Sequence, residues 1–491
     1  MERFKTSQKQ NLSALESGKL MLWQIKKIQH CHFPDLSRRL LGLDDPRKAE
    51  QYTIEELVMA AIVLFLLKCD SRNDFNNKCK DEQFRANYRR MFGLHLPHMD
   101  AVNELFEEMS PDEMENIRCR LINALIEKRV FHKIRFFGKC FCIAIDATGV
   151  YNWGNNPSEE VREFALTKKY GKSKEAEKGK EAEKDKEADK GEESDKGKES
   201  DKKRKISYFS QVLEAVLICK NGTSIPVMTE WIANEGEDYD KQDCELKAFK
   251  RLAVRLRNYF PKLNICILAD GLYSNISLMD ICKEYGWKFI SVFKDGNLPN
   301  VWKEVESLLP LSEAAKCRTQ HTNESNHRIK RTYRWLENID YHKHKIVWLE
   351  CVQESVNMKT GERQENRFVF ITNLEVKKNN VISTLTAGRA RWFIEDHFNT
   401  QKNRGGNLHH KFNRKNLFAI KNWHNARQLA CAIEELVKHT AELQQLKNED
   451  QKLTWKTLWE NLNSYLTMLS VEVQMTDFEH WSKSQRQVRL E

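Results

Sequence analysis

The sequence lacks the features of a membrane protein, a secreted protein or a zinc-binding protein. Its longest apolar run, Leu57 to Leu67, has 11 residues, whereas a helix that spans a bilayer needs roughly 20. The first ten residues contain no apolar stretch of the kind found in secretory signals. The 13 cysteines include no C-x-x-C pair, which argues against a disulfide scaffold and a zinc cluster. We therefore expect a cytoplasmic protein with no membrane partner, in which the apolar run forms a buried helix.

Length and charge indicate several domains and a polyanionic partner. The chain has 491 residues, of which 40% are hydrophobic. At a usual domain size of about 150 residues, this length predicts roughly three domains. The 81 Lys and Arg residues outnumber the 71 Asp and Glu residues by 10. Such an excess suits nucleic acid, but alone it identifies no partner.

Residues 1–135 are predicted to form a helical N-terminal domain. Thr53 and Glu56 make a capping box, and Ser110 precedes Pro111 at the start of a second helix. A small helical domain ahead of a larger core suits DNA binding, although no helix-turn-helix signature is present. A helical bundle with another role is the alternative.

Residues 136–300 change to a strand-rich pattern. An apolar strand over 140–145 ends on Asp146, and Asn221-Gly222 joins two further strands in a typical hairpin. The pattern then predicts helices over 246–260 and 276–285 and strands over 265–269 and 288–293, and the first of these strands leads into Asp270.

A charged segment interrupts this block before the hairpin. Residues 174–203 form five similar hexads, within an insert of about 170–205 that has almost no apolar side chains. Such a segment buries too little surface to offset its ordering entropy, so we expect a disordered surface insert. A tether that touches DNA is the alternative, although its acidic and basic residues nearly balance.

The rest of the chain is predicted in three parts. Residues 301–375 are β-rich, with strands over 332–335, 345–351 and 367–372. Residues 376–440 contain a helix from Ser383 to Asn403. Residues 441–491 form a helical C-terminal region, for which we expect a role in dimerisation.

Three carboxylates are candidates for a site that binds divalent cations. Asp146 and Asp270 end the two clearest central strands, and Glu395 lies on the helix that returns to the sheet. Adjacent carboxylates repel one another unless cations neutralise them, and two hard ions can activate an attacking oxygen and stabilise a leaving one. The sequence therefore predicts metal-assisted phosphoryl transfer. A capping role in a turn is the alternative for each aspartate.

Two cations share the helix face of Glu395. Relative to Arg391, Glu395 and Lys402 project at about 40° and about 20° around an ideal helix. The carboxylate can then hold metal while Arg391 and Lys402 grip phosphates of the same substrate. A solvated Arg–Glu pair on a surface helix is the alternative.

A basic stretch with interspersed aromatic residues follows this helix. The pattern is typical of contact with a DNA backbone, and a solvated helix face is the alternative. Its residues are Arg404, His409, His410, Lys411, Arg414, Lys415 and Lys421, together with Phe412, Phe418 and Trp423.

These motifs resemble those of the RNase H-like DDE transposases of bacterial insertion sequences. The resemblance covers about residues 139–440, with I-A-I-D-A-T-G around Asp146, L-A-D-G-L-Y-S-N around Asp270 and R-W-F-I-E-D-H-F-N-T-Q-K around Glu395. The last motif is similar to that of the branch with the signature Y-x-x-R-x-x-x-E-x-x-x-x-x-x-K and a β-rich insertion. Gly388 stands where this signature has tyrosine.

The resemblance implies an α+β or α/β fold class, with an RNase H-like mixed sheet flanked by helices and completed by residues 376–440. It implies that Asp146, Asp270 and Glu395 bind two Mg²⁺ ions, with Mn²⁺ as a substitute, while Arg391 and Lys402 contact phosphates. It also implies cut-and-paste transposition by a homodimer assembled on double-stranded DNA, both transposon ends and target, in the nucleoid region of a bacterial cytoplasm. A plain nuclease and a DNA-binding protein derived from a transposase that has lost catalysis are the alternatives.

Aromatic residues extend this resemblance to a DNA hairpin intermediate. In the branch that the chain resembles, an aromatic side chain of the β-rich insertion holds a flipped base during hairpin formation. We expect Phe368 to take this role, with Trp335 or Trp348 as replacements, and Trp392 to be a further DNA contact. A buried strand position without a role in DNA binding is the alternative for Phe368.

Overall fold

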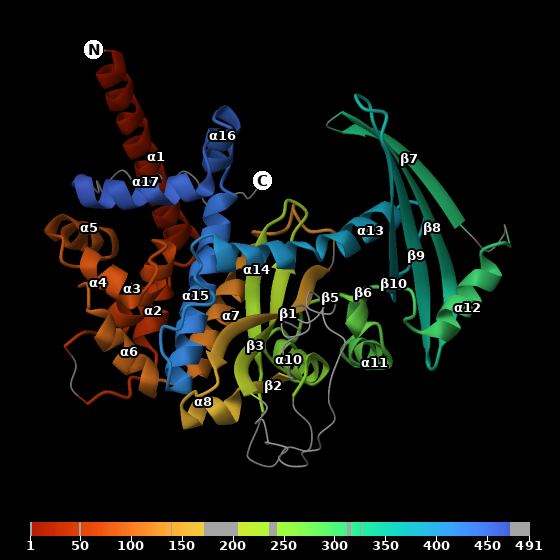
Figure 1. The fold of residues 1–491 in the computed structure, drawn as a ribbon, viewed down its shortest axis with the longest axis horizontal. Coiled ribbons are helices and arrows are strands. Elements are labelled where there is room, and N and C mark those ends of the chain that lie inside the picture. The colour runs from red at the N-terminus through yellow and green to blue at the C-terminus, as the bar shows by residue number, and fades with distance from the viewer. Residues whose placement is uncertain are drawn as a thin grey trace, which may run out of the picture.

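The computed structural model describes residues 2–48, 51–138, 140–170, 205–234, 243–311, 316–324 and 326–471. In these ranges the chain is a mixed α/β protein in which helices flank one mixed sheet (Figure 1). The predicted hexads at 174–203 lie outside the described residues.

The N-terminal part is helical, as predicted. The capping box of Thr53 and Glu56 forms and opens α3, which is buried along its whole length. The predicted buried helix over the apolar run is therefore confirmed, and no described helix has the length and apolarity needed to cross a bilayer. The helices are α1 Glu2–His32, α2 Leu36–Leu41, α3 Ile54–Leu66, α4 Arg72–Lys78, α5 Glu82–Phe92, α6 Met99–Glu108 and α7 Pro111–Glu127.

The central strands follow in the order β4-β3-β1-β5-β6 across the sheet. β1 and β4 pair antiparallel with β3, whereas β5 pairs parallel with both β1 and β6. The predicted hairpin is confirmed, and Gly222 in its turn has a φ of 86° that suits glycine. The bounds are β1 Phe141–Gly154, β2 Leu166–Tyr170, β3 Lys205–Ile218, β4 Ser224–Ile232, β5 Ile265–Ala269 and β6 Lys288–Val292.

Strand β1 is longer than predicted. It does not end at Asp146 but continues to Gly154, paired with β3 except for register shifts between Gly149 and Tyr151 and between Asn152 and Gly154. The apolar pattern stops at Ile145 because the pairing of β1 with β5 ends at Ala144, so the later residues have a strand neighbour on one side only. Asp146 therefore lies within a strand, at the point where its neighbour ends.

Helices pack on both faces of these strands. The predicted helices over 246–260 and 276–285 are confirmed as α10 and α11, and Gly286 ends α11 with a φ of 69°. A short helix that the pattern did not predict, α8, precedes β2. The bounds are α8 Glu159–Phe164, α10 Glu245–Tyr259 and α11 Ile276–Tyr285.

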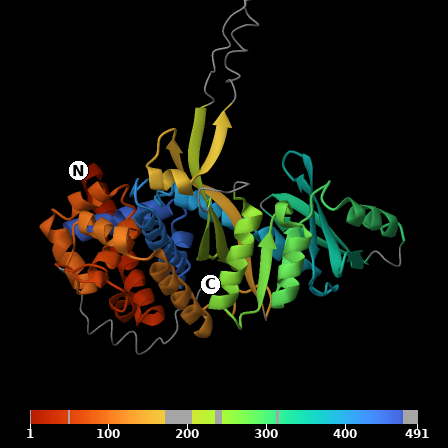
Figure 2. The ribbon, with the colours of Figure 1, turned by 90° about the horizontal axis from the view of Figure 1, so that it is seen from below.

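The β-rich segment extends the central sheet and does not form a sheet of its own. β10 pairs antiparallel with β6, and β9, β8 and β7 follow outward, with α12 packed against β8. Figure 2 shows these strands on the side of the molecule opposite the N-terminal helices. The bounds are α12 Pro299–Leu308, β7 Lys316–Glu324, β8 His327–Tyr341, β9 His344–Asn357 and β10 Arg363–Thr372.

The single helix predicted from Ser383 to Asn403 is wrong in one respect. Two helices, α13 Val381–Ala390 and α14 Phe393–Asn403, meet at Arg391 and Trp392. At the junction the amides of Arg391 and Trp392 donate to carbonyls three residues back, so the turn is tighter than an α-helix.

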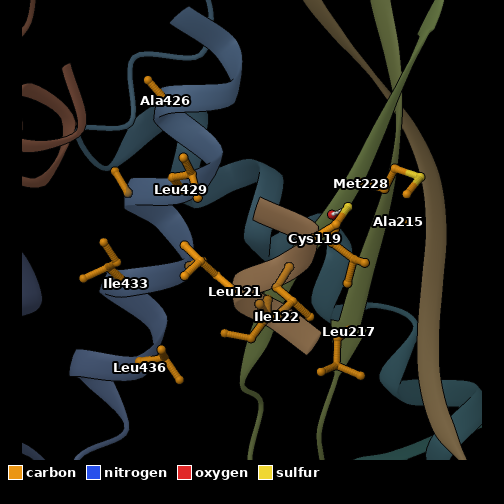
Figure 3. Packing of buried hydrophobic residues seen from close by; sticks show 14 of the residues in the cluster. Cys119, Leu121, Ile122, Ala215, Leu217, Met228, Ala426, Leu429, Ile433 and Leu436 are labelled. Atoms are coloured by element: carbon orange, nitrogen blue, oxygen red, sulfur yellow. Dashed lines mark hydrogen bonds between the residues drawn. The ribbon is translucent and has the colours of Figure 1, made fainter. Parts of the chain in front are cut away.

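The C-terminal helices pack against the N-terminal ones. α15 Leu417–Lys438 contacts α3, α6, α7 and β4, and α17 Trp455–Met468 crosses α1 and packs against it (Figure 1). Figure 3 shows apolar side chains of α15 beside those of α7 and of the β3–β4 hairpin. A third helix, α16 Ala441–Glu449, joins α15 to α17. The first and last described parts of the chain therefore share one hydrophobic core.

Candidate active site

The sheet register brings Asp146 and Asp270 to the same level on neighbouring strands. Ala144 of β1 pairs with Leu268 of β5, and each aspartate follows two residues later. Adjacent strands lie about 4.8 Å apart. The side chains are 23% and 30% exposed, so solvent reaches both carboxylates.

Asp270 also caps the turn that follows β5. Its side chain accepts a hydrogen bond from the amide of Leu272 at 2.9 Å. The Nζ of Lys294 lies 3.9 Å from the other carboxylate oxygen. The capping alternative for Asp270 is thus real, but it engages one oxygen and leaves the second available.

Arg391 joins two of the predicted carboxylates. Its guanidinium lies 3.3 Å from Oδ2 of Asp146 and 2.5 Å from Oε1 of Glu395. The arginine side chain is 11% exposed. The ion pairs therefore connect β1 with the first turn of α14, in a place that is largely shielded from solvent.

The carboxylates influence one another electrostatically. Burial raises the pKa of Asp146, the charges of Asp270 and Glu395 raise it further, and the guanidinium of Arg391 opposes this shift. Burial lowers the pKa of Lys402, while the negative charge of Asp146 acts in the opposite direction. All five predicted residues of the central site therefore lie in one neighbourhood, although the single helix predicted to carry Arg391, Glu395 and Lys402 is broken at Arg391 and Trp392.

Two residues beside the aspartates were not predicted. Burial raises the pKa of Glu245, and the charges of Asp146 and Asp270 raise it further. Tyr273 donates a hydrogen bond to Glu245 at 3.4 Å. In the sequence Glu245 is an ordinary acidic residue of a first helical turn, so only the tertiary structure reveals its position.

The ligand chemistry of the site suits a hard divalent cation, since its candidate donors are carboxylate oxygens. In the described ranges, however, no three His, Cys, Asp or Glu side chains are gathered closely enough to hold a metal ion. The positive charge between Asp146 and Glu395 is the guanidinium of Arg391.

A cavity of about 850 Å³ adjoins Arg391. It lies between the junction of α13 with α14 and the ends of β6 and β10, and basic and aromatic side chains line it, among them Phe368, Arg389, Arg391 and Trp392. The side chain of Trp392 is 64% exposed. Phe368 is half-buried, with the guanidinium of Arg389 4.2 Å from its ring centre. Aromatic surface is thus available next to the carboxylates.

The two replacements considered for Phe368 are wrong. Trp335 is 2% exposed and Trp348 is fully buried, because both side chains point into the packed faces of the outer strands. Neither can stack on a base without unfolding its surroundings.

Gly388, which stands at the tyrosine position of the signature, lines the same cavity. A Cβ built on Gly388 would lie 2.9 Å from the ring of Phe370 and 3.0 Å from the side chain of Ile290. Helix α13 therefore packs on the sheet more closely than any side chain here allows, so a tyrosine at this position would not fit without a shift of α13.

The basic stretch after α14 divides into exposed and buried parts. Exposed side chains include Arg404, His409, His410, Arg414 and Lys415, while Lys411 is half-buried against Trp153 and Lys421 lies 5.0 Å from the ring of Phe164. The expectation that Phe412 and Trp423 lie on a DNA-binding surface is wrong. They are 2% and 0% exposed and stack on each other in the core, so only Phe418, at 45%, is accessible.

A buried polar network supports the helix that carries Glu395. Gln401 of α14 exchanges hydrogen bonds with Gln428 of α15 at 3.1 and 3.3 Å. Gln428 also donates to Glu214 of β3, which lies 2.8 Å from Nε2 of His424. Nδ1 of His424 is buried and has no hydrogen-bond partner among the described residues, so the network is only partly satisfied. It links α14 to α15 and β3.

No protein-family model matches this chain, and neither does any curated protein sequence. The class of the protein is therefore inferred from its residues and geometry.

Proposed function

We propose that this protein is a DNA transposase with an RNase H-like catalytic core. The observation that carries the proposal is the level placement of Asp146 and Asp270 on adjacent parallel strands, with Glu395 linked to Asp146 through Arg391. The strand order β4-β3-β1-β5-β6, antiparallel and then parallel, supports an RNase H-like core. The four strands β7 to β10, which lie between β6 and Glu395, support the branch with a β-rich insertion.

The chain's own residues divide the chemical work. Asp146, Asp270 and Glu395 would hold Mg²⁺ or Mn²⁺, which supplies activation of the attacking oxygen and stabilisation of the leaving one. Lys402 and Lys294 lie beside the aspartates and would hold a phosphodiester against them. Charge-assisted contacts of this kind fix the backbone but do not read its sequence.

Double-stranded DNA is the proposed substrate, and the alternatives stay distinct from it. A transposase cleaves transposon ends and joins them to target DNA as a dimer, while a nuclease on the same fold would only cleave. A protein derived from a transposase that has lost catalysis would only bind DNA. The presence of all three carboxylates and of Arg391 and Lys402 favours an active enzyme.

The test uses labelled duplex DNA from the regions that flank the reading frame, where inverted repeats would mark transposon ends. Purified protein is incubated with this DNA and Mg²⁺, and denaturing gels follow cleavage and joining. Joined product supports the transposase, cleavage without joining supports the nuclease, and binding without cleavage supports the protein that has lost catalysis. The Asp146→Asn variant controls for contaminating nuclease.

A further inference from the structure

We infer that Arg391 is an internal counter-ion of the carboxylate site, which competes with a divalent cation for Asp146 and Glu395 until a DNA phosphate draws it away. This inference rests on the proposed function and deepens it. It explains why carboxylates suited to a metal are paired with a guanidinium in the described structure. It also makes binding of DNA and binding of metal mutually dependent.

The geometry of Arg391 differs from that of the other nearby cations. Its two terminal nitrogens contact carboxylates of two different elements, at 3.3 and 2.5 Å. Lys294 approaches only Asp270, at 3.9 Å, and its side chain is 64% exposed. The charge of Asp146 acts on the pKa of Lys402, but Lys402 does not contact two carboxylates as Arg391 does. Arg391 alone among these three therefore stands between two candidate metal ligands.

An arginine can leave this position only by moving. The guanidinium stays protonated in proteins, so it cannot give up its charge to make room for another cation. A divalent cation that uses both Asp146 and Glu395 must therefore compete with Arg391 for the same oxygens. Metal binding to the DNA-free protein should be weakened by the free energy of these ion pairs.

The cavity beside Arg391 offers a replacement partner. Arg391 lines this cavity together with Lys220, Lys294, Arg367 and Arg389, and Asp295 is the acidic residue among the lining side chains. A phosphodiester attracted by these cations would present two oxygens to the guanidinium, a geometry that arginine binds in bidentate fashion. The swing of one side chain from carboxylates to phosphate would free Asp146 and Glu395.

Thermodynamic linkage makes this exchange measurable without any reaction. If DNA relieves the competition, DNA must tighten metal binding, and metal must tighten DNA binding by the same factor. Removing Arg391 should give the tighter metal affinity in the absence of DNA and should abolish most of the coupling.

The experiment measures Mn²⁺ binding to the full chain by titration calorimetry and by loss of the free Mn²⁺ electron-resonance signal. Without DNA, Arg391→Ala should bind Mn²⁺ at least about fivefold more tightly than the natural protein, the lower end of typical coupling. Arg389→Ala is the matched control. Arg389 lies two residues before Arg391 and carries the same charge, but its side chain is exposed and contacts neither carboxylate. Its affinity should stay within about twofold of the natural value.

Lys402→Ala distinguishes the general electrostatic effect of a nearby positive charge from direct competition for the carboxylate oxygens. It removes a charge that acts on Asp146 without bridging two carboxylates, so its gain in Mn²⁺ affinity should be smaller than that of Arg391→Ala. An equal gain would overturn the inference. If Arg391→Ala does not fold, as judged by circular dichroism, Arg391→Gln removes the charge with less loss of packing.

A synthetic duplex DNA provides the second arm, with Mn²⁺ bound by the duplex itself subtracted through the Asp146→Asn variant. The duplex should tighten Mn²⁺ binding to the natural protein and leave Arg391→Ala nearly unchanged. Equal tightening in both proteins, or no gain in Arg391→Ala without DNA, would overturn the role of Arg391. If Asp146→Asn binds Mn²⁺ as well as the natural protein does, the proposed metal site fails, which is a separate result.

Discussion

The sheet has a central half, formed by β1 to β6, and an outer half, formed by β7 to β10. The two halves are stabilised in different ways. In the central half, β5 is buried along its whole length and β1 is buried up to Ile145. In the outer half, β8 alternates between buried and more exposed residues, and charged side chains pair across strands, as Arg367 does with Glu350 at 2.6 Å. The central half is a packed interior, whereas the outer half has one face built from polar contacts.

This difference assigns the two halves different tasks in the proposed enzyme. Buried strands have little freedom to shift, so the residues that follow them, such as Asp270, are held in place. Exposed cations, such as Lys330, whose side chain is 44% exposed and pairs with the 49% exposed Glu354, can exchange a carboxylate for a phosphate at low cost, because exposed ion pairs contribute little free energy. We therefore expect the central half to determine chemistry and the outer half to adapt to the substrate.

The largest expected effect comes from neutralising a carboxylate of the central half. Asp146→Asn, Asp270→Asn and Glu395→Gln should each reduce Mg²⁺-dependent cleavage by at least about 10²–10³-fold, while DNA binding in gel-shift assays stays largely intact. Asp396→Asn, which changes an exposed carboxylate next to Glu395, should leave cleavage nearly unchanged. Substantial cleavage by any of the three variants, with Mg²⁺ as the only divalent cation, would remove that residue from the site.

The next largest effect is expected where the two halves meet, at the pairing of β6 with β10 under helix α13. Here the predicted change is in the free energy of unfolding. Gly388 packs against Ile290 of β6 and Phe370 of β10, so Gly388→Ala should lower the free energy of unfolding by about 1–3 kcal/mol through overpacking. Gly138→Ala is the control, since a Cβ there meets no atom within 4 Å. Denaturant titration of both variants measures the difference. Equal stability of the two variants would show that α13 can move away from these two strands.

Cations next to the carboxylates should affect DNA binding more moderately. Arg391→Ala and Lys402→Ala should each reduce the slope of log affinity against log salt by roughly one unit, since each removes one proposed phosphate contact. Lys456→Ala, an 84% exposed cation on α17, should leave the slope unchanged. Arg391 is only 11% exposed, so the alternative of a solvated surface pair is already contradicted. Unchanged slopes in both site variants would favour a buried structural role for Arg391 without contact to DNA.

The outer half is tested by Phe368→Ala. Loss of one base–aromatic stack costs roughly 1–3 kcal/mol, so the first nick should form while the hairpin product decreases and nicked DNA accumulates on denaturing gels. Phe418→Ala, an exposed ring outside the cavity, should leave the hairpin yield unchanged. Normal hairpin yield in Phe368→Ala would assign the stacking role elsewhere, with Trp392 as the next candidate. Absence of hairpins from the natural protein would exclude this route.

Local signals in the sequence predicted the central half well. The turn at Asn221-Gly222, the α11 cap at Gly286 and the apolar strand ahead of Asp270 are each encoded within a few residues, and the structure has them at the expected positions. The β-rich character of the outer half was also predicted from its β-branched and aromatic residues. Its continuity with β6 was not, because strand pairing between distant segments leaves no local pattern.

The candidate site likewise contains residues that local sequence patterns predicted and residues that they could not predict. Asp146, Asp270, Glu395, Arg391 and Lys402 stood out through strand ends and helical spacing, whereas the positions of Glu245 and Lys294 depend on how elements pack. Periodicity also failed to distinguish the buried aromatics of the basic stretch from exposed ones. Trp423 has the spacing of a surface residue beside lysines, but α15 is buried along most of its length.

The smallest expected effect concerns residues 174–203, which were predicted from the sequence as a disordered insert in the central half. β2 and β3 pair up to Tyr170 and Lys205, so deleting 174–203 would leave Gly171, Lys172, Ser173 and Arg204 to join two paired strand ends. Four-residue loops are common in β-hairpins, and shortening a long loop favours its closure by about 0.6 kcal/mol per halving of its length, or about 2 kcal/mol for the three halvings here. The melting temperature should therefore not fall, and the rate of cleavage should change little. A large loss of melting temperature would mean that the hexads pack against the core, and loss of DNA affinity with unchanged stability would support the tether alternative.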